Sequence, residues 1–479
     1  MLNRLDTLLL YAPALLYALW LTSDKKKAIK YIAFGALPII IWEIFSLLYY
    51  GYLIPNTAYA KLSTGISVFA YIEQGIYYFV DSISTDPVTL LAVIIATILT
   101  VRAKEKRYLA LVAGMLLYVL YILKIGGDFM SGRFFTAPFI LAVVTMSSMI
   151  SMKKKAAYIC VIGLCIYGLL NPLSPIRNNI DCENIKEELI AKNPRYYNYG
   201  ITDERWFYYC KDGLMSWFDG VDMSVEKKQK SEDIVYQISA NIGKYGYYAA
   251  SNEHLIDVFA LADPLLSHIN IIEKRGLNKT IYGWRIGHFY RPLPFGYVET
   301  LKGGVNVIQS EKIAKLYDVV TIITRGNIFS VERLKAILNM NLGRYDEYSD
   351  FSGDVAFTDI DEIGARSAFD SPFSSREDRW YYAETVIVDL HGKQFVKSMD
   401  VSLNSSDNYE ITYMNGDEDL ASMVVKDLPN PHNTDGLTPY TFDVPEQILS
   451  TGFDKLRIAH TNGPTGFYLG RVVLNQDSQ

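Results

Sequence analysis

The stretch Gly126–Arg133, GGDFMSGR, decides how the first third of this chain is interpreted. It separates two apolar runs, Tyr108–Ile125 and Thr136–Met152, each about long enough to cross a bilayer as a helix. Charged side chains at membrane depth are normally paired, water-facing or functional, and glycines let a backbone approach an anion closely. Asp128 and Arg133 therefore predict a site at the membrane surface for a phosphate-bearing substrate. The simpler alternative is a tight helical hairpin in which these two side chains only pair with each other.

The composition changes sharply along the chain. Of 479 residues 50% are hydrophobic, and nearly all long apolar runs lie before Pro172. This predicts a transmembrane domain over residues 1–172, with an extracytoplasmic α/β domain (173–375) and a β-sandwich (376–479) after it. A net charge of −6, without a basic face interleaved with aromatics, argues against a nucleic-acid partner. No Walker A loop, Rossmann fingerprint, HExxH or GxSxG motif is present.

The apolar runs predict about six membrane-spanning helices. They are Leu5–Thr22, Ile29–Tyr50, Pro87–Val101, Tyr108–Ile125, Thr136–Met152 and Ala156–Leu170. Lysines and arginines follow the first, third and fifth runs, and the positive-inside rule places these links in the cytoplasm. The GGDFMSGR turn, the loop Gly51–Asp86 and everything after Pro172 then lie outside. Because the amino terminus would also lie outside, we expect a further membrane segment to precede this sequence.

The loop Gly51–Asp86 and the second apolar run each contain residues with two interpretations. Within Gly51–Asp86, Asn56 follows a proline and predicts a turn into a short helix. Val68–Val80 has apolar residues at helical spacing, which predicts an amphipathic helix lying on the membrane or packed on the soluble domain. Glu43, inside the second apolar run, either lines the site or is a protonated side chain bonded between helices.

The soluble part shows alternating patterns typical of a small α/β domain. Helices are predicted at Glu232–Gly246, Ile308–Leu316 and Val331–Leu338, and strands at Tyr247–Ala250, Leu255–Phe259 and Val319–Ile323. Asp263 follows a predicted strand, where ligand contacts are common, although Asp-Pro is also an ordinary turn signal. Further on, Arg285, His288 and Arg291 alternate with aromatics, which predicts that they bind a phosphate or a sugar. A lone histidine is equally often structural.

The last hundred residues contain short alternating runs separated by turn residues, which predicts the β-sandwich. Surface aromatics on it would bind carbohydrate, or the sandwich is a stabilising lid.

Cys160 and Cys165 lie in an apolar run and predict helix packing, whereas Cys182 and Cys210 would be able to form a disulfide if exported. No motif in the sequence requires a cofactor. Asp128 and Asp263 remain candidates for binding a divalent metal.

Four motifs occur in the same order in a bacterial membrane family. They are YYGYLIPNTAYAKL (49–62), GGDFMSGRFFTAP (126–138), LADPLLSHI (261–269) and WRIGHFYRPLPFGY (284–297). From about Tyr49 to its end, the chain resembles this family, which includes the mycobacterial terminal β-arabinofuranosyltransferase of cell-wall arabinan and a relative named for flagellar motor control. The resemblance implies a GT-C glycosyltransferase fold, with a multi-helix membrane domain, an external domain and a polyprenyl-phosphate sugar as donor.

One departure from the family matters for the chemistry. GT-C enzymes usually carry a catalytic aspartate in the first external loop, which this sequence lacks, so the resemblance does not place the base. Asp128 is the available carboxylate for that role. The donor phosphate or sugar would be bound by residues drawn from all four motifs, namely Asn56, Lys61, Arg133, Asp263, Arg285, His288 and Arg291.

The function expected from these residues is sugar transfer to a cell-envelope glycan on the outer face of a bacterial cytoplasmic membrane. Membrane lipid, the polyprenyl-phosphate donor and the glycan acceptor are then the partners. The alternative is a non-catalytic membrane protein that binds a lipid-linked sugar or forms part of a scaffold, for example at the flagellar motor.

Overall fold

The structure is a computed structural model. It describes residues 4–151, 155–171, 199–204, 234–239, 242–271, 284–291, 293–350, 355–361, 381–382, 385–405, 408–429, 437–461 and 469–475. The chain divides into two compact units. The helical unit contains Met1–Leu47, Ile66–Met223 and Thr280–Ile286, and the mixed unit contains Leu48–Gly65, Ser224–Lys279 and Gly287–Gln479. The disulfide considered between Cys182 and Cys210 lies outside the described residues.

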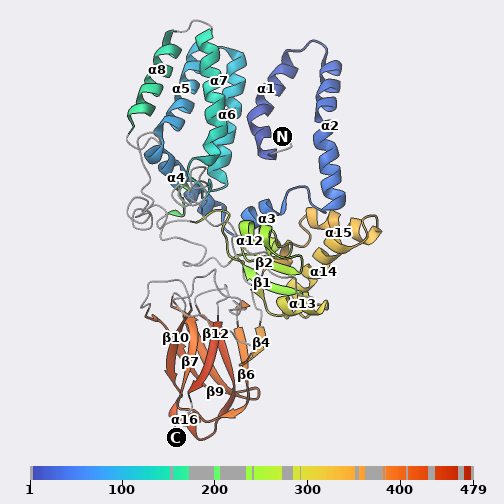
Figure 1. Ribbon diagram of the computed structural model, residues 1–479, viewed down its shortest axis with the longest axis vertical. Helices are drawn as coiled ribbons and strands as arrows, with labels where there is room; N and C mark the ends of the chain where they lie inside the picture. Colours follow the sequence, from blue (N-terminus) through green and yellow to red (C-terminus); the bar gives the residue numbers. More distant parts are fainter. Residues whose placement is uncertain are drawn as a thin grey trace. The chain divides into compact units, whose positions relative to one another are not determined.

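The helical unit consists of apolar helices joined by short links (Figure 1). In order these are η1 (Leu5–Thr7), α1 (Leu8–Leu21), α2 (Lys25–Tyr49), α4 (Val68–Thr85), α5 (Pro87–Ala103), α6 (Lys106–Lys124), η2 (Arg133–Phe135), α7 (Thr136–Ser151) and α8 (Lys155–Leu170). α1 packs along α6, and α5 packs along α7. The helices occupy the predicted stretches, so a helical and apolar first part of the chain is confirmed, with two to three candidate membrane spans among the described residues.

The predicted number of six spans is supported only in part. Among the described residues, α2 and α6 are long and apolar enough to cross a membrane, and a third span results if α4 and α5 are taken as one. These two helices meet at 102°, because Asp86 and Pro87 interrupt the helix between them. α1, α7 and α8 are apolar but shorter. The lengths of the described helices therefore support two or three membrane spans.

Helix α4 carries its apolar side outward. Phe69 is 84% exposed and Ile76 51% exposed, whereas Gln74, Tyr78 and Asp81 are buried. A surface helix of a soluble protein has the opposite arrangement, with the apolar stripe facing the core. The outward apolar stripe suits a helix whose outer side meets lipid, which agrees with the amphipathic helix predicted for this stretch.

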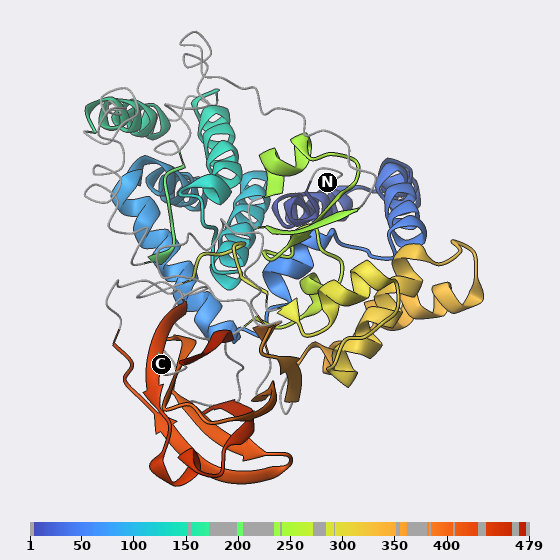
Figure 2. The same cartoon turned by 60° about the horizontal axis from the view of Figure 1, so that its bottom comes forward.

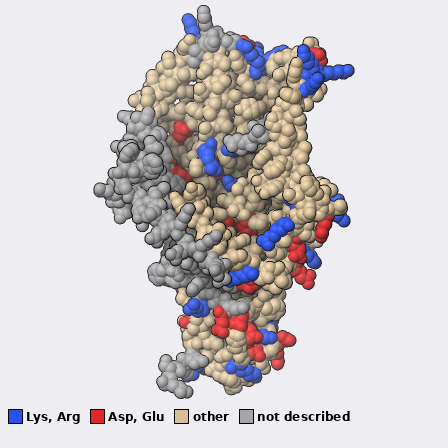
Figure 3. All heavy atoms as spheres, turned by 45° about the vertical axis from the view of Figure 1, so that its right-hand side comes forward, with Lys and Arg blue, Asp and Glu red and all other residues tan. Residues whose placement is uncertain are grey.

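Basic residues gather at one end of the helical unit. Figure 3 shows Lys and Arg atoms at the top of the view, above a surface on which most atoms are uncharged. Lys25 and Lys27 lie in the first turn of α2, Lys104 lies between α5 and α6, and Lys106 is the first residue of α6. The GGDFMSGR turn follows the other end of α6, so it lies away from these basic links.

The mixed unit begins with a small α/β part. Its elements are α3 (Asn56–Leu62), β1 (Val235–Ser239), α12 (Ile242–Tyr248), β2 (Glu253–Asp257), η4 (Leu266–His268), β3 (Leu293–Pro294), α13 (Tyr297–Gly303), α14 (Glu311–Arg325), α15 (Val331–Asn341) and η5 (Asp346–Ser349). β1 and β2 pair in parallel, with α12 between them in sequence. The predicted strand at Leu255–Phe259 overlaps β2, and the predicted helix at Val331–Leu338 lies within α15.

Two predictions in this part are wrong, and a third is right only in part. The helix expected over Glu232–Gly246 is present from Ile242 onward in α12, but Val235–Ser239 form strand β1, whose valine, tyrosine and isoleucine favour a strand once β2 is available as a partner. The strand expected at Val319–Ile323 lies within α14, which buries its apolar side chains at helical spacing. The strand expected at Tyr247–Ala250 is the end of α12 and the loop after it.

The C-terminal part is the predicted β-sandwich. Its strands are β4 (Val355–Asp359), β5 (Tyr381–Tyr382), β6 (Thr385–Gln394), β7 (Ser398–Asn404), β8 (Tyr409–Asn415), β9 (Glu418–Val425), β10 (Leu437–Asp443), β11 (Phe453–His460) and β12 (Leu469–Asn475), with the short helix α16 (Glu446–Leu449) before β11. One sheet has the order β4-β6-β11-β8-β9 and the other β10-β7-β12, while β5 pairs with β3. Both sheets contribute to one buried core. Figure 2 shows the orange and red strands of the two sheets side by side. β4, β5 and β10 lie outside the runs identified in the sequence.

A buried arginine holds two helix ends in the mixed unit. Arg333 of α15 is 1% exposed. Its guanidinium donates to the carbonyls of Ile323 (2.7 Å), Leu48 (2.6 Å), Tyr49 (2.9 Å) and Ile328 (3.3 Å). The last carbonyls of a helix have no partner within the helix, so a cation placed there satisfies them.

We expect Arg333→Met to lower the free energy of unfolding by about 3 kcal/mol, because it leaves these carbonyls buried without donors. The control is Arg344→Met, which removes an exposed side chain whose bond goes to Asn339. That change should stay within about 0.5 kcal/mol. Thermal unfolding of both full-length variants in the same detergent measures the difference. Equal shifts would mean that Arg333 does not stabilise the helix ends.

Candidate functional site

The turn between α6 and α7 is shaped by Tyr78 of α4. The Tyr78 hydroxyl donates to the carbonyl of Met130 and accepts from the amide of Phe134, both at 3.1 Å. Gly127 has φ +70 and lies against the Tyr78 ring, where a Cβ would fall 2.3 Å from the ring carbon Cγ. Gly126 also has positive φ, +80. The two glycines are thus required by backbone conformation and by close packing.

Two distant segments pack onto this turn. The amide of Thr202 donates to the carbonyl of Phe129 (2.7 Å), and the amide of Ser131 donates to the carbonyl of Thr202 (3.0 Å). Gln74 of α4 accepts from the amide of Trp284 and donates to the carbonyl of Tyr199, both at 2.7 Å. Residues 199–204 and 284–286 are therefore held beside the turn within the helical unit.

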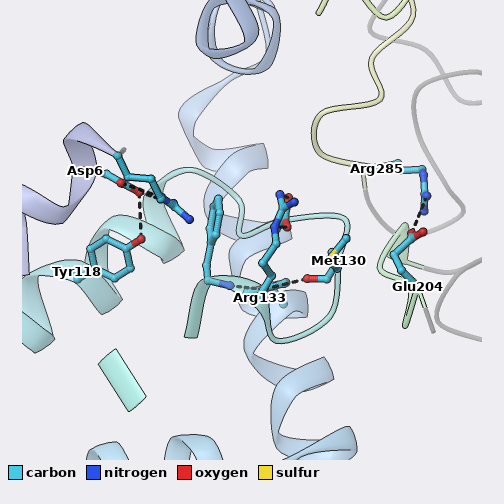
Figure 4. Close-up of polar contacts among 10 residues, drawn as sticks. Asp6, Tyr118, Met130, Arg133, Glu204 and Arg285 are labelled. Atoms are coloured by element: carbon cyan, nitrogen blue, oxygen red, sulfur yellow. Dashed lines mark hydrogen bonds and ion pairs between the residues drawn. The ribbon is translucent and has the colours of Figure 1, made fainter. Parts of the chain in front are cut away.

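Arginines and aromatic rings alternate across the site. The Arg285 guanidinium carbon lies 5.1 Å from the centre of the Phe129 ring, and that of Arg133 lies 5.3 Å from the same ring. Arg133 is also 5.5 Å from the ring of Phe134, which Arg4 approaches to 4.6 Å. We call these five residues the arginine–aromatic array. Figure 4 shows Arg133 at its centre, between the contacts of Arg285 on one side and those of Asp6 on the other.

The central arginine is paired with the aspartate of the same turn. Arg133 Nη2 donates to Asp128 Oδ1 (2.7 Å), and Arg133 Nε lies 2.6 Å from Asp128 Oδ2. Asp128 is 1% exposed, whereas the Arg133 side chain is 37% exposed. The pair proposed in the simpler reading is present, but the array adds two more arginines to it. Asp81 of α4, also buried, accepts from the Ser131 hydroxyl (2.6 Å).

Each outer arginine has a carboxylate of its own. Arg285 donates to Thr202 Oγ1 (2.8 Å) and to Glu204 Oε1 (3.3 Å). Burial raises the pKa of the Glu204 carboxyl, although Arg285 acts in the opposite direction. Both terminal nitrogens of the Arg285 guanidinium are thereby held beside the turn.

At the other end of the array, Arg4 donates to both oxygens of Asp6, at 3.1 and 2.5 Å. Asp6 also accepts from the Tyr118 hydroxyl of α6 (3.0 Å). Reading the sequence missed Arg4 and Asp6, as it missed Asp81 and Glu204. The available signal was a charged pair directly before an apolar helix, in a segment otherwise interpreted only as the start of a span.

The other predicted site residues belong to the mixed unit. Asn56 begins α3 and donates from Nδ2 to the carbonyls of Ala260 (3.0 Å), Leu261 (3.1 Å) and Asp263 (3.2 Å). Its Oδ1 accepts from the Ser267 hydroxyl (2.7 Å). All these bonds fix the loop before η4, so the geometry gives Asn56 a role in packing two of the sequence motifs together.

Arg291 is 1% exposed and donates to main-chain carbonyls of Leu266 (3.0 Å), Ala60 (2.9 Å) and Ser63 (3.3 Å). It therefore binds the protein's own backbone. The ring of His288 packs edge-on against that of Phe259, with centres 5.1 Å apart. Lys61 runs along Gly287, where a Cβ would lie 2.9 Å from Lys61 Cε.

Asp263 is buried and caps the turn before η4. Its Oδ1 accepts from the amides of Leu265 (3.0 Å) and Leu266 (2.8 Å), and both of its oxygens accept from the Tyr297 hydroxyl. Burial raises the pKa of the Asp263 carboxyl from 3.8 to about 6. Burial thus favours the protonated form more in the folded protein than in the unfolded chain, although the amides and the Tyr297 hydroxyl act in the opposite direction.

This pKa predicts a pH-dependent difference between the wild type and Asp263→Asn. A carboxyl with a raised folded-state pKa stabilises the fold below pH 3.8, and that contribution is lost as pH rises through about 6. Relative to the neutral variant, the wild type should lose roughly 3 kcal/mol of stability across this window. Chemical unfolding at pH 4, 5, 6 and 7 measures it. Parallel stability curves for the two proteins would contradict the burial argument.

Of the predicted site residues, Asp128, Arg133 and Arg285 come together in the helical unit. Asn56, Lys61, Asp263, His288 and Arg291 lie in the mixed unit. Neither Asp128 nor Asp263 belongs to a group of three metal-ligating side chains within the described residues. The Asp128 oxygens contact Arg133, and the Asp263 oxygens accept from amides and a phenol.

Comparison with known proteins gives no match. No family model, no curated protein and no solved structure is similar to this chain. The likeness to the arabinofuranosyltransferase family therefore remains a resemblance of sequence motifs, and the function is argued below from the geometry of the site.

Proposed function

We propose that this chain is a membrane glycosyltransferase that moves a sugar from a polyprenyl-phosphate donor to a cell-envelope glycan. The observation that carries the proposal is the arginine–aromatic array at one end of apolar helices. Arg133, at its centre, keeps about a third of its side chain open to solvent. Guanidinium groups match phosphate oxygens in shape and charge, so such an array suits a lipid-linked phosphate.

The surroundings of the array suit a lipid substrate. α4 contributes Tyr78 and Asp81 to the turn from its buried side, while Phe69 and Ile76 lie on its outward apolar side. A polyprenyl chain would lie along this outer side in the lipid while its phosphate reaches the arginines. By the positive-inside rule the basic links lie in the cytoplasm, and the turn then lies on the outer face of a bacterial inner membrane.

The chemistry proposed is an inverting displacement at the anomeric carbon. The acceptor hydroxyl loses its proton to a carboxylate, its oxygen bonds to that carbon, and the bond from the carbon to the donor phosphate breaks. The departing phosphate gains a negative charge, which Arg133 and the neighbouring arginines stabilise.

Asp128 is the proposed base, and its ion pair explains how it becomes available. In the structure both Asp128 oxygens contact Arg133. A donor phosphate that binds Arg133 competes with Asp128 for the same guanidinium. Binding of the donor would therefore release the carboxylate for proton transfer only when the substrate is in place.

The second candidate function is a non-catalytic protein that binds a lipid-linked sugar or belongs to a membrane scaffold. One observation favours it: each of the three arginines of the array already has a carboxylate partner. A self-neutralised network of this kind is also what a purely structural site contains.

Transfer measured on the full-length protein in lipid nanodiscs separates these functions. The assay supplies a polyprenyl-phosphoryl pentose or hexose and a short glycan acceptor, and it follows both donor binding and product. Transfer supports the enzyme, and binding without transfer supports the second candidate. Neither binding nor transfer with any donor of this class would contradict both.

A further inference from the structure

A group of metal-ligating side chains lies on the β-sandwich, far along the chain from the array. β4 and β6 run in parallel, and Asp359 is directly opposite Asp389. Asp361 and His391 each follow two residues later. The sequences Asp-Ile-Asp and Asp-Leu-His each bend here, Asp361 in the turn after β4 and His391 with φ +60, and the first aspartate of each accepts from the amide two residues later.

Three of these side chains converge closely. His391 Nε2 lies 2.9 Å from Asp359 Oδ1 and 3.2 Å from Asp361 Oδ2. One ligand atom from each residue lies within 4.8 Å of the others, and this is the one such group in the described part of the chain.

The main chain holds the group in place. The amide of Asp361 donates to Asp359 Oδ1 (2.7 Å), and the amide of His391 donates to Asp389 Oδ1 (2.8 Å). The amide of Ile360 bonds to the carbonyl of Asp389 and continues the pairing of the two strands. The two short sequences are thus fixed relative to each other by strand pairing and by the turns at the strand ends.

The charges of the group are unbalanced. In the described part of the chain, neither Asp359 nor Asp361 forms an ion pair with a lysine or an arginine, and His391 is the partner of both. Asp389 adds a third carboxylate beside them. Even a protonated imidazole leaves an excess of negative charge, which a divalent cation would neutralise.

We propose that Asp359, Asp361 and His391 bind a divalent first-row transition-metal ion, with zinc as the representative. An imidazole nitrogen with carboxylate oxygens is a ligand set that zinc and its neighbours in the series use, whereas calcium and magnesium prefer oxygen alone. Asp361 is 85% exposed and His391 51% exposed at the side chain, so water completes the coordination. Asp389 orients His391 through its main-chain amide.

Calorimetric titration of zinc chloride into the chelator-stripped full-length protein tests the site. We expect one saturable site that His391→Gln weakens by about 10–100-fold or more, the range seen when even an outer partner of a ligand is removed. Asp361→Asn, at a largely exposed position that the fold tolerates, should also weaken it. The matched control is Asp419→Asn, an exposed carboxylate on the same sheet that pairs with Arg457 and should leave zinc affinity unchanged.

Two results would overturn the proposal. One is equal zinc affinity in the wild type, His391→Gln and Asp361→Asn, which would show that an imidazolium bridging two carboxylates explains the group. The other is a preference for calcium or magnesium that does not depend on His391. Circular dichroism of the variants confirms that they are folded, and no transfer assay enters the test, so its outcome is independent of the proposed function.

Discussion

Asp128→Asn should lower the rate of sugar transfer by about 10²–10⁴-fold, the range that a positioned general base contributes. Asparagine has nearly the same shape and still offers an acceptor to Arg133, but it does not take a proton from the acceptor hydroxyl. Donor binding, measured separately with polyprenyl phosphate, should stay the same or tighten. Tightening is expected because the donor phosphate no longer competes with a charged carboxylate for Arg133.

The control for this experiment is Asp86→Asn. Asp86 is an exposed carboxylate of the same unit, where it accepts from the Thr89 hydroxyl at the start of α5. Its replacement should change transfer less than about threefold, because none of its hydrogen bonds within the described residues involves a residue of the array. If Asp128 only orients Arg133, the loss in Asp128→Asn would instead be found in the KM for the donor, with kcat retained. Wild-type transfer in Asp128→Asn would remove this residue from the mechanism.

Gly127→Ala should disrupt the turn that carries the site. At φ +70, an alanine Cβ would fall 2.3 Å from Cγ, 2.5 Å from Cβ and 2.7 Å from Cδ1 of Tyr78. The ring is buried and bonded to Met130 and Phe134, so it has little freedom to move aside. Backbone strain and overpacking together should lower the free energy of unfolding by roughly 2–5 kcal/mol.

Gly132 in the same turn supplies a matched control. It has nearly the same backbone conformation, φ +69, but a Cβ there would meet nothing within 4 Å. Gly132→Ala should therefore show the backbone strain alone, about 1 kcal/mol. Comparing thermal unfolding and donor binding of the two variants isolates the contact with Tyr78. Equal losses would show that this packing does not hold the turn.

The sequence was most informative where one property dominates a segment. Apolar runs located the helices of the first part, and alternation located most strands of the sandwich, because both signals depend only on the environment of one face. The number of spans is supported only in part, because α1, α7 and α8 are apolar but shorter than a helix needs to be to cross a bilayer. β1 was misread from helical periodicity, although its side chains favour a strand that pairs with β2. α14 was misread because its packing overrides the strand preference of its β-branched residues.

The site was predictable only in part for a related reason. Asp128 and Arg133 lie close in sequence, and their glycine-rich turn revealed them. Arg285 was noticed for its motif, but nothing in the sequence shows that it shares the Phe129 ring with Arg133. Arg4 arrives from the first residues of the chain, and its contact with Phe134 depends on the packing of α1 along α6.

The most direct test of the central claim is a structure of the full-length protein with polyprenyl phosphate bound. We predict that the phosphate lies within hydrogen-bond distance of the Arg133 guanidinium, with the ion pair to Asp128 opened and the polyprenyl chain along the outer side of α4. A phosphate bound elsewhere, with Arg133 still paired to Asp128, would contradict the assignment of the arginine–aromatic array as the donor site.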